Sequence, residues 1–168
     1  VTHALAEIPG PPDQIIVLLP PTQPLRTPAH VQQAIALLKD SGADSVVSVV
    51  EIPQTHHPMF ALDVVHGKLG RYNPPLRLER FGSTFVWMPQ RSMAKLPTVR
   101  QAVVPAYIRD GTVYAFWRKT VETHGTIYGQ DVRPLIIPPE ETCPLDTMAD
   151  WAEAERRLHE LEYLGARS

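Results

Sequence analysis

The sequence has very little cysteine and no long apolar run. Its single cysteine, Cys143, cannot form a disulfide within the chain, which is typical of a protein in a reducing, cytoplasmic setting. The longest apolar runs are far shorter than the roughly 20 residues that a transmembrane helix needs. We therefore expect a cytoplasmic protein that makes no contact with a membrane.

An excess of charge of one sign is also missing. The formal net charge of the 168 residues is −2, and acidic and basic residues are interspersed along the chain. A general nucleic-acid binder usually carries a basic surface. The sequence therefore predicts no nucleic-acid partner, whereas a small nucleotide ligand, which needs only a few local cations, is compatible with this charge.

Glycine is scattered rather than clustered. None of the nine glycines belongs to a glycine-rich loop of the kind that cradles phosphate groups. The Gly-x-Ser-x-Gly pattern of hydrolases and paired Cys-x-x-Cys motifs are missing as well. His56 and His57 are adjacent but have no third ligand at metal-site spacing, so we expect them in a solvated loop.

What the sequence does contain is an alternation of short apolar runs with helical patterns. The run at 14–19 has no polar alternation and predicts a strand buried on both faces of a parallel sheet. Further strands are expected at 45–52, 59–65, 112–117 and 132–137. Because the helical segments lie between strands and the length suits one domain, we expect a single three-layer α/β domain over residues 1–168.

Two helices have clear boundary signals. Thr27 is a good N-cap, Pro28 suits the first helical position, and Gly42 is a natural C-terminal stop. Near the end of the chain, Thr147 and Asp150 form a capping-box pattern. The helix that follows is predicted to pack one apolar stripe and to turn its charged residues to water; the stripe is Met148, Trp151, Ala154, Leu158 and Leu161.

Several stretches resemble, in order and approximate spacing, the acylneuraminate cytidylyltransferase family, whose members make CMP-activated acidic sugars. The first reads Leu-Leu-Pro-Pro-Thr-Gln-Pro-Leu-Arg and ends at Arg26, where the family typically reads Leu-Leu-Gln-Pro-Thr-Ser-Pro-Leu-Arg. The second reads Ser-Gly-Ala-Asp-Ser-Val-Val-Ser-Val from Ser41. The other matches are His57-Pro58, Arg100-Gln101, the run from Gly111 to Phe116, and the run from Leu145 to Trp151.

The resemblance implies a Rossmann-like nucleotide-diphospho-sugar transferase fold, truncated at the N-terminus. The first third of the family's domain, with its first strand and its phosphate-binding loop, has no counterpart in this sequence. The resemblance also implies CTP and an acidic sugar as ligands, Mg²⁺ as cofactor, and a homodimer. Residues 68–104 lack a clear period and carry large apolar groups, and by resemblance they form a protruding dimerisation arm.

This combination leads to two functional expectations. The first is a nucleotidyltransferase of the cytidylyltransferase type whose isolated chain has impaired or no activity, because the phosphate loop is missing. The alternative is a catalytically silent binding or structural homodimer that uses the same fold, since function resides in the site and not in the scaffold.

By resemblance, five residues contact the nucleotide or the sugar. Arg26 would pair with a phosphate or a carboxylate, or it would simply organise its loop together with Thr22. Arg100 and Gln101 match a ligand-facing pair, with a solvated arginine as the alternative. Asp110 stands where the family has asparagine, and its charge would repel an anionic sugar.

Two further family residues are replaced. Pro20 occupies the position of a sugar-contacting glutamine, and Pro144 occupies the position of one of the two metal-binding acids. Asp146 is the remaining acid and is the predicted Mg²⁺ ligand. The alternative is that Asp146 and Asp150 only complement the positive end of the last helix.

Overall fold

The computed structural model describes residues 1–58, 62–65, 68–71 and 105–165. The chain divides into two compact units, one made of Val1–Val50 with Arg109–Ser168 and the other of Glu51–Ile108. The first unit holds the main sheet and its helices, and the second holds a small hairpin. A single domain over residues 1–168 therefore stays a prediction.

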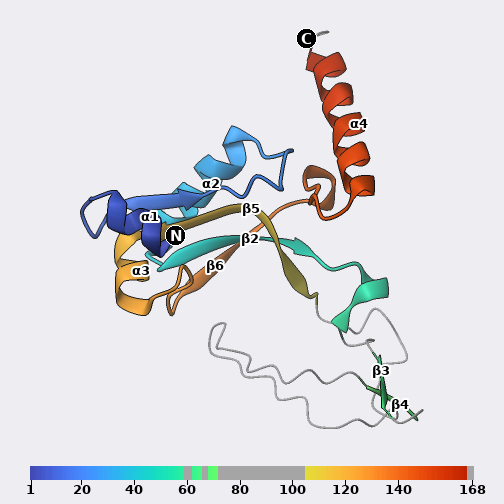
Figure 1. The fold of residues 1–168 in the computed structure, drawn as a ribbon, viewed down its shortest axis with the longest axis horizontal. Helices are drawn as coiled ribbons and strands as arrows, with labels where there is room; N and C mark the ends of the chain where they lie inside the picture. The colour runs from blue at the N-terminus through green and yellow to red at the C-terminus, as the bar shows by residue number, and fades with distance from the viewer. Residues whose placement is uncertain (59–61, 66–67, 72–104, 166–168) are drawn as a thin grey trace. The chain divides into compact units, whose positions relative to one another are not determined.

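The main sheet has four strands in the order β1-β5-β2-β6 (Figure 1). β2 and β6 are parallel, but β5 runs antiparallel to β1. Hydrogen bonds join Trp117 to Asp44 and Val113 to Ser48, so β5 is antiparallel to β2 as well. The prediction of a parallel sheet around the first strand is therefore wrong, because the sheet is mixed. The strands are β1 (Ile15–Leu18), β2 (Ser45–Glu51), β5 (Tyr107–Trp117) and β6 (Val132–Ile136).

The direction of β5 could not be read from its own side chains. Parallel neighbours require a crossover connection, usually a helix, whereas an antiparallel strand can follow an irregular connection. The residues before β5 show no helical period in the sequence, which removes the usual requirement for a parallel partner. The pattern of β5 indicates a strand, and the connection decides its direction.

Helix α2 (Pro28–Ser41) joins β1 to β2 and covers one face of the sheet. Its predicted boundaries are confirmed: Thr27 is the N-cap, Pro28 is the first helical residue, and Gly42 ends the helix with φ 66°. Two residues four positions apart, Ala34 and Leu38, are fully buried. They form one apolar core with three strand residues, Val46, Val113 and Ala115.

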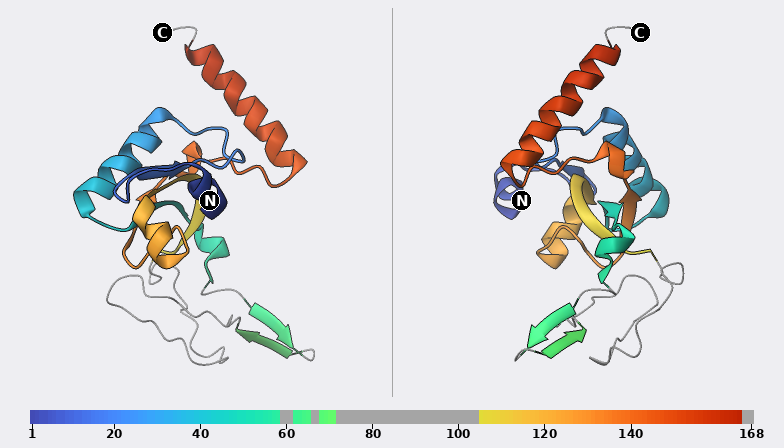
Figure 2. Two further views of the ribbon diagram at one scale, coloured as in Figure 1. Left: turned by 60° about the vertical axis from the view of Figure 1, so that its left-hand side comes forward. Right: turned by 90° about the vertical axis from the view of Figure 1, so that its right-hand side faces the viewer.

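The opposite face of the sheet is covered where α3 (Arg118–His124) follows β5. Side chains alternate along a strand, so Phe116 points away from the α2 face that Ala115 contacts, yet it is also fully buried. Val121 of α3 is buried too. Figures 1 and 2 show α2 and α3 on opposite sides of the sheet. The predicted α/β class is therefore confirmed.

The first helix, α1 (Thr2–Glu7), is held by hydrogen bonds rather than by apolar burial. None of its residues is buried. The guanidinium of buried Arg118 donates to the backbone oxygens of Leu5, at 3.0 Å, and Ile8, and to Gln14 Oε1 at 3.1 Å. A buried arginine needs such partners, and here they tie the start of the chain to the end of β5.

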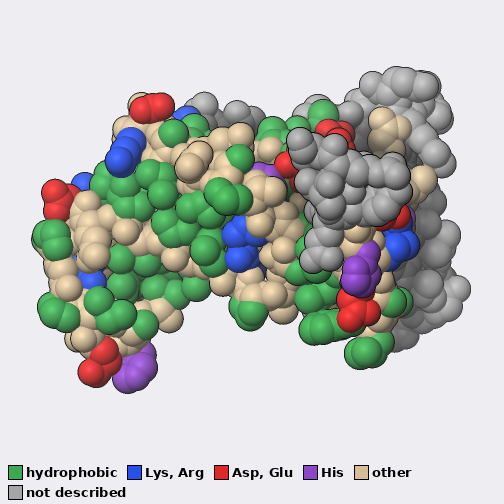
Figure 3. All heavy atoms as spheres, turned by 90° about the horizontal axis from the view of Figure 1, so that it is seen from above, with side chains coloured by type: hydrophobic (Ala, Val, Ile, Leu, Met, Phe, Trp, Pro, Cys, Tyr) green, Lys and Arg blue, Asp and Glu red, His purple; other side chains and the backbone are tan. Residues whose placement is uncertain are grey.

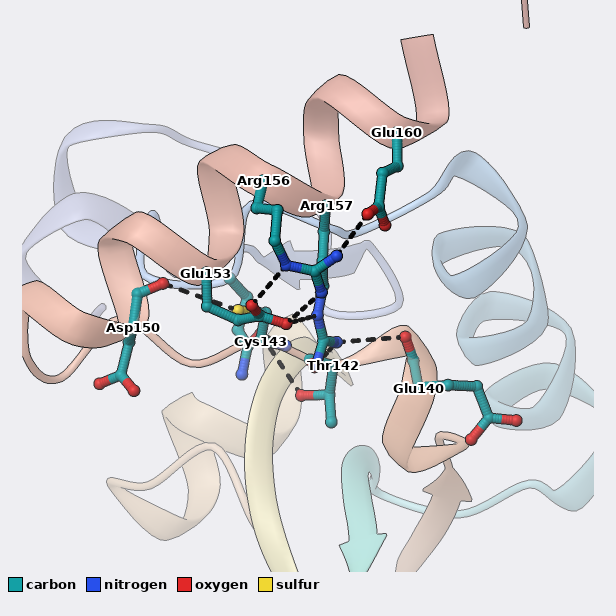
Figure 4. Close-up of polar contacts among 9 residues, drawn as sticks. Glu140, Thr142, Cys143, Asp150, Glu153, Arg156, Arg157 and Glu160 are labelled. Carbon is teal, nitrogen blue, oxygen red and sulfur yellow. Dashed lines mark hydrogen bonds and ion pairs between the residues drawn. The ribbon is translucent and has the colours of Figure 1, made fainter. Parts of the chain in front are cut away.

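Helix α4 (Met148–Gly165) is attached to the sheet unit through its first half (Figure 4). Ala154 is buried in a small apolar cluster with Leu25 and Cys143. Arg157 donates to the backbone oxygens of Thr142 at 3.1 Å and Glu140 at 3.4 Å. Its guanidinium also pairs with Glu153 at 2.6 Å, which is the ion pair expected at i,i+4 spacing.

The apolar stripe predicted for α4 stays largely exposed. Met148 and Trp151 are 81% and 51% exposed, and Leu158 is 39% exposed. Only Ala154 of the stripe is buried among the positions whose side chains the structure describes; Leu161 lies outside them. The spacing correctly predicts a helix, but three large side chains of its apolar stripe are exposed.

The second unit contains the short helix η1 (Gln54–His56) and a hairpin of β3 (Leu62–Val65) and β4 (Lys68–Arg71). The predicted strand at 59–65 is confirmed over the described residues 62–65. The predicted dimerisation arm at 68–104 falls outside the described residues, except for the four that form β4.

No helix among the described residues combines the length and the apolar character needed to cross a membrane. Figure 3 shows one face of the molecule, where lysine and arginine side chains lie as isolated groups among apolar and acidic ones. This distribution agrees with the interspersed charges of the sequence.

A carboxylate at the start of β2 orders the loop that precedes β6. Asp44 Oδ2 accepts hydrogen bonds from the backbone N–H groups of Gln130, at 2.7 Å, and Asp131, at 2.9 Å. The bond from Asp131 is the main cause that lowers the pKa of Asp44. Gly129 has φ 64°, and a Cβ atom there would lie 2.4 Å from the Asp44 Cβ, so only glycine fits beside the carboxylate.

We predict that Asp44→Ala lowers the free energy of unfolding by about 1–3 kcal/mol at pH 7, because two backbone donors lose a charged acceptor. The folded pKa of Asp44 lies below the ordinary value of about 3.9, so this contribution is present above that pH and disappears as pH falls through the folded value. Urea denaturation from pH 7 to pH 2 measures the difference. Exposed Asp40→Ala is the control, and a difference that stays constant in acid would contradict the argument.

Candidate functional site

Three segments that are distant in the sequence meet at one end of the main sheet. They are the loop at 20–26 after β1, the turn at 109–112 within β5, and the segment at 142–147 that leads into α4. Because β5 is antiparallel to β1, its early residues lie beside the carboxyl end of β1. Ligands of open α/β sheets bind at this end, outside the carboxyl ends of the parallel strands.

Gln23 joins all three segments. Its side chain is buried, with 3% exposed, and its Nε2 donates to the backbone oxygen of Asp110. Its Oε1 accepts from the backbone N–H of Cys143 at 3.3 Å and from the Thr142 hydroxyl at 3.5 Å. A buried amide with partners on both ends fixes the distance between the segments that it connects.

Arg26 lies in the same cluster and is largely committed to the backbone. Its Nε donates to the oxygen of Thr112 and its Nη2 to the oxygen of Pro20, both at 2.5 Å. Burial lowers the pKa of Arg26, and the nearby carboxylate of Asp110 opposes that shift. The guanidinium therefore organises its loop, which is one of the two expected roles, and Nη1 is not engaged in a hydrogen bond among the described residues.

The Asp110 carboxylate forms hydrogen bonds within its own turn. Its Oδ1 accepts from the backbone N–H of Thr112 at 3.1 Å, and its Oδ2 accepts from the Thr112 hydroxyl. Gly111 between them has φ 79°, a conformation that favours glycine. The structure brings Asp110 near Arg26, with the carboxylate already hydrogen-bonded.

Thr22 is connected to the last segment through its backbone. Its carbonyl oxygen accepts from the N–H of Leu145 at 3.0 Å, which places Asp146 one residue away from this junction. The side chain of Thr22 and that of Asp146 are exposed. Asp146 therefore lies at the rim of the cluster, adjacent to the bond that joins the loop at 20–26 to the segment at 142–147.

Asp150 is the helix cap that its spacing predicts. Its Oδ2 accepts from the backbone N–H and the hydroxyl of Thr147, at 2.7 and 2.8 Å, while Thr147 Oγ1 accepts from the N–H of Asp150. The hydroxyl bond is the main cause that lowers the pKa of Asp150. The same carboxylate also accepts from the N–H of Asp146 at 3.2 Å, so the cap orders the backbone of the predicted metal ligand.

A pair of an arginine and a tyrosine lies at the start of the turn at 109–112. The Arg109 guanidinium donates to the Tyr128 hydroxyl and lies 5.7 Å from the centre of its ring. Burial raises the pKa of Tyr114 on the same strand, and Tyr128 adds to this shift. Sequence reasoning missed this group, because Tyr128 lies in a loop outside every matched motif and only the fold brings it to β5.

Sequence reasoning also missed Gln23 and His30. Gln23 lies inside the matched motif between the predicted site residues Thr22 and Arg26, but the sequence does not indicate that a glutamine in a loop is buried. His30 follows Thr27 at the third helical position, where the capping-box pattern usually has Glu or Gln. Its ring is buried and bonds to Glu141, a residue 111 positions away.

The other predicted positions stand differently. Arg100 and Gln101 lie outside the described residues. His56 is exposed in η1, as expected for a solvated loop, whereas His57 is buried, so that expectation is wrong for His57. Among the residues that the structure describes, no three His, Cys, Asp or Glu side chains gather in a way that could hold a metal ion by themselves.

A comparison of the sequence with models of known protein families finds no match.

We predict that Gln23→Leu lowers the free energy of unfolding by about 1–3 kcal/mol, because the variant keeps the side-chain volume but leaves the buried N–H of Cys143 and the partly buried carbonyl of Asp110 unpaired. Chemical denaturation provides the measurement. Exposed Gln33→Leu on α2 is the matched control and should change stability by less than about 0.5 kcal/mol. A loss no larger than that of the control would show that the amide does not hold the three segments together.

Proposed function

We propose that this chain is a cytidylyltransferase-like protein of the nucleotide-diphospho-sugar transferase type, related to enzymes that form CMP-linked acidic sugars from CTP with Mg²⁺. One observation carries the proposal. Three stretches that resemble family motifs, although far apart in the sequence, meet at one end of the sheet through the bonds of Gln23, Arg26 and Leu145. The carboxyl-end location is where such folds bind ligands.

The chemistry requires cations that neutralise phosphate charge and a geometry that positions the reacting groups. Arg26 supplies a cation to this cluster, and its Nη1, which makes no hydrogen bond among the described residues, is a donor for a phosphate or a carboxylate oxygen. Asp110, next to it, disfavours a second anion on that side. We therefore expect a phosphate oxygen to bind at Nη1 of Arg26.

Mg²⁺ would be held by Asp146 together with nucleotide phosphates and water. The Asp146 side chain is exposed, and its carboxylate accepts no hydrogen bond from the other described residues. One carboxylate fits a magnesium ion that takes its other ligands from phosphates, which is a common arrangement for this metal. When bound, the ion would neutralise charge on the phosphates.

Turnover by this chain alone is expected to be impaired or absent. The sequence contains no glycine-rich phosphate loop, so the triphosphate would be held by few donors. Catalysis of this kind depends on positioning, which a weakly held triphosphate does not supply. The homodimer and the cytoplasmic location, both expected from the sequence, belong to this proposal as well.

A second candidate is a catalytically silent binding or structural homodimer module. The observation that favours it is that Arg26 and Asp110, two of the motif residues, already form hydrogen bonds within the protein. Side chains that hold their own backbone preserve the fold without requiring a ligand. The two candidates differ in one measurable property, which is the binding of CTP with Mg²⁺.

We predict that CTP with Mg²⁺ raises the melting temperature of the chain, because a ligand that binds only the folded state adds about 2.7 kcal/mol at a hundred times its Kd. Thermal shift and calorimetry measure the effect. Asp146→Ala should remove the part of the shift that depends on Mg²⁺ while leaving the melting temperature without ligand unchanged. Asp13→Ala, another exposed acid, should keep the whole shift.

Two results would change the conclusion. An unchanged melting temperature at millimolar CTP would reject the cytidylyltransferase-like site and favour the silent module. Release of pyrophosphate in the presence of CTP, Mg²⁺ and an acidic sugar at the usual enzymatic rates, about 1–10³ per second, would reject the expectation of impaired turnover.

A further inference from the structure

The segment at 138–147, which joins β6 to α4 and is here called the connecting segment, carries the predicted metal ligand. Two of its amides are fixed by the loop after β1: Cys143 donates to Gln23, and Leu145 donates to Thr22. On another side, Arg157 of α4 donates to two of its carbonyl oxygens (Figure 4). Among the described residues, a further hydrogen bond joins the segment to α2 through one side chain.

That side chain is His30. It lies in the first turn of α2 and is 3% exposed. Its Nε2 is 2.7 Å from Glu141 Oε2, and Glu141 belongs to the short helix η5 (Pro139–Glu141) within the connecting segment. The Glu141 side chain is half exposed, whereas that of His30 is buried, so the histidine is the fixed partner of this contact.

The hydrogen bonds assign the tautomer of this histidine. The backbone N–H of Thr27 donates to His30 Nδ1 at 3.3 Å, so Nδ1 acts as the acceptor. The proton is therefore on Nε2 and is donated to the Glu141 carboxylate. One ring closes the capping box of α2 and, through its other nitrogen, bonds the connecting segment.

We propose that His30 is a positioning residue for the site: through Glu141 it holds the connecting segment against α2, and so sets the place of Leu145 and the adjacent Asp146 relative to the loop at 20–26. Capping alone does not require histidine, because Glu or Gln at this position completes a capping box. The role of Asp146 in binding Mg²⁺ rests on the proposed function, whereas the attachment of the connecting segment to α2 by His30 does not.

The experiment separates the cap from the attachment. His30→Glu keeps an acceptor for the Thr27 N–H but has no N–H that could be donated to Glu141. Glu141→Ala removes the attachment from the other side, and Glu141→Gln keeps an oxygen acceptor. Glu140→Ala is the matched control, because this neighbouring acid is exposed and only its backbone oxygen is bonded.

The measurement is amide hydrogen exchange, resolved by residue, in the full chain. We expect His30→Glu and Glu141→Ala to speed exchange at Cys143 and Leu145 about tenfold or more while exchange at Val113 and Ala115 in β5 stays unchanged. Glu141→Gln should restore most of the protection, and the double variant of His30→Glu with Glu141→Ala should resemble Glu141→Ala, because each single variant already lacks the same bond.

Three outcomes would overturn the proposal. They are unchanged exchange at Cys143 and Leu145 in Glu141→Ala, an equal acceleration in Glu140→Ala, and a uniform acceleration that includes β5, which would mean general destabilisation. If the wild-type chain binds CTP more tightly with Mg²⁺ than without it, Glu141→Ala should also reduce this Mg²⁺-dependent gain in CTP affinity severalfold. If the wild type binds no CTP, the proposed function fails, and the exchange data still decide the role of His30.

Discussion

The antiparallel insertion of β5 between β1 and β2 is the constraint on which the rest of the molecule depends. It places the turn at 109–112 beside the carboxyl end of β1, where the loop at 20–26 begins. A parallel strand at this position would deliver that turn to the other end of the sheet. The contacts of Gln23 and Arg26 with the turn exist only because the strand runs in this direction.

Within the cluster, polar side chains mainly satisfy backbone groups. Gln23 and Arg26 bond to the backbone oxygens of Asp110 and Thr112 in β5, and Gln23 also accepts from the backbone N–H of Cys143. This is expected where loops are packed together, because buried backbone donors and acceptors must find partners. The same arrangement makes the motif residues useful for the fold, while Arg26 Nη1 and the Asp146 carboxylate make no hydrogen bond among the described residues.

Helix α4 shows how differently its two sides are used. Ala154 and Arg157 attach the helix to the connecting segment, and the acidic and basic residues along it form ion pairs with one another; the pairs with Arg156 and Arg157 lower the pKa of Glu153 to about 2 (Figure 4). These pairs are exposed and contribute little to stability. Cap and short-range attachment therefore position the helix more than burial of its large apolar side chains does.

Local signals in the sequence were enough to predict where several helices begin and end. The cap and stop of α2, the end of α3 at Gly125 and the capping box of α4 each depend on neighbours within four residues, so the order of types along the chain predicts them. The α/β class and the apolar runs of the strands follow in the same way. The tertiary structure alone decided the direction of β5, the burial of Gln23 and His30, the exposure of the α4 stripe, and the meeting of residues about 90 to 120 positions apart. These properties depend on which surfaces the folded chain brings together, and a one-dimensional pattern does not contain that information.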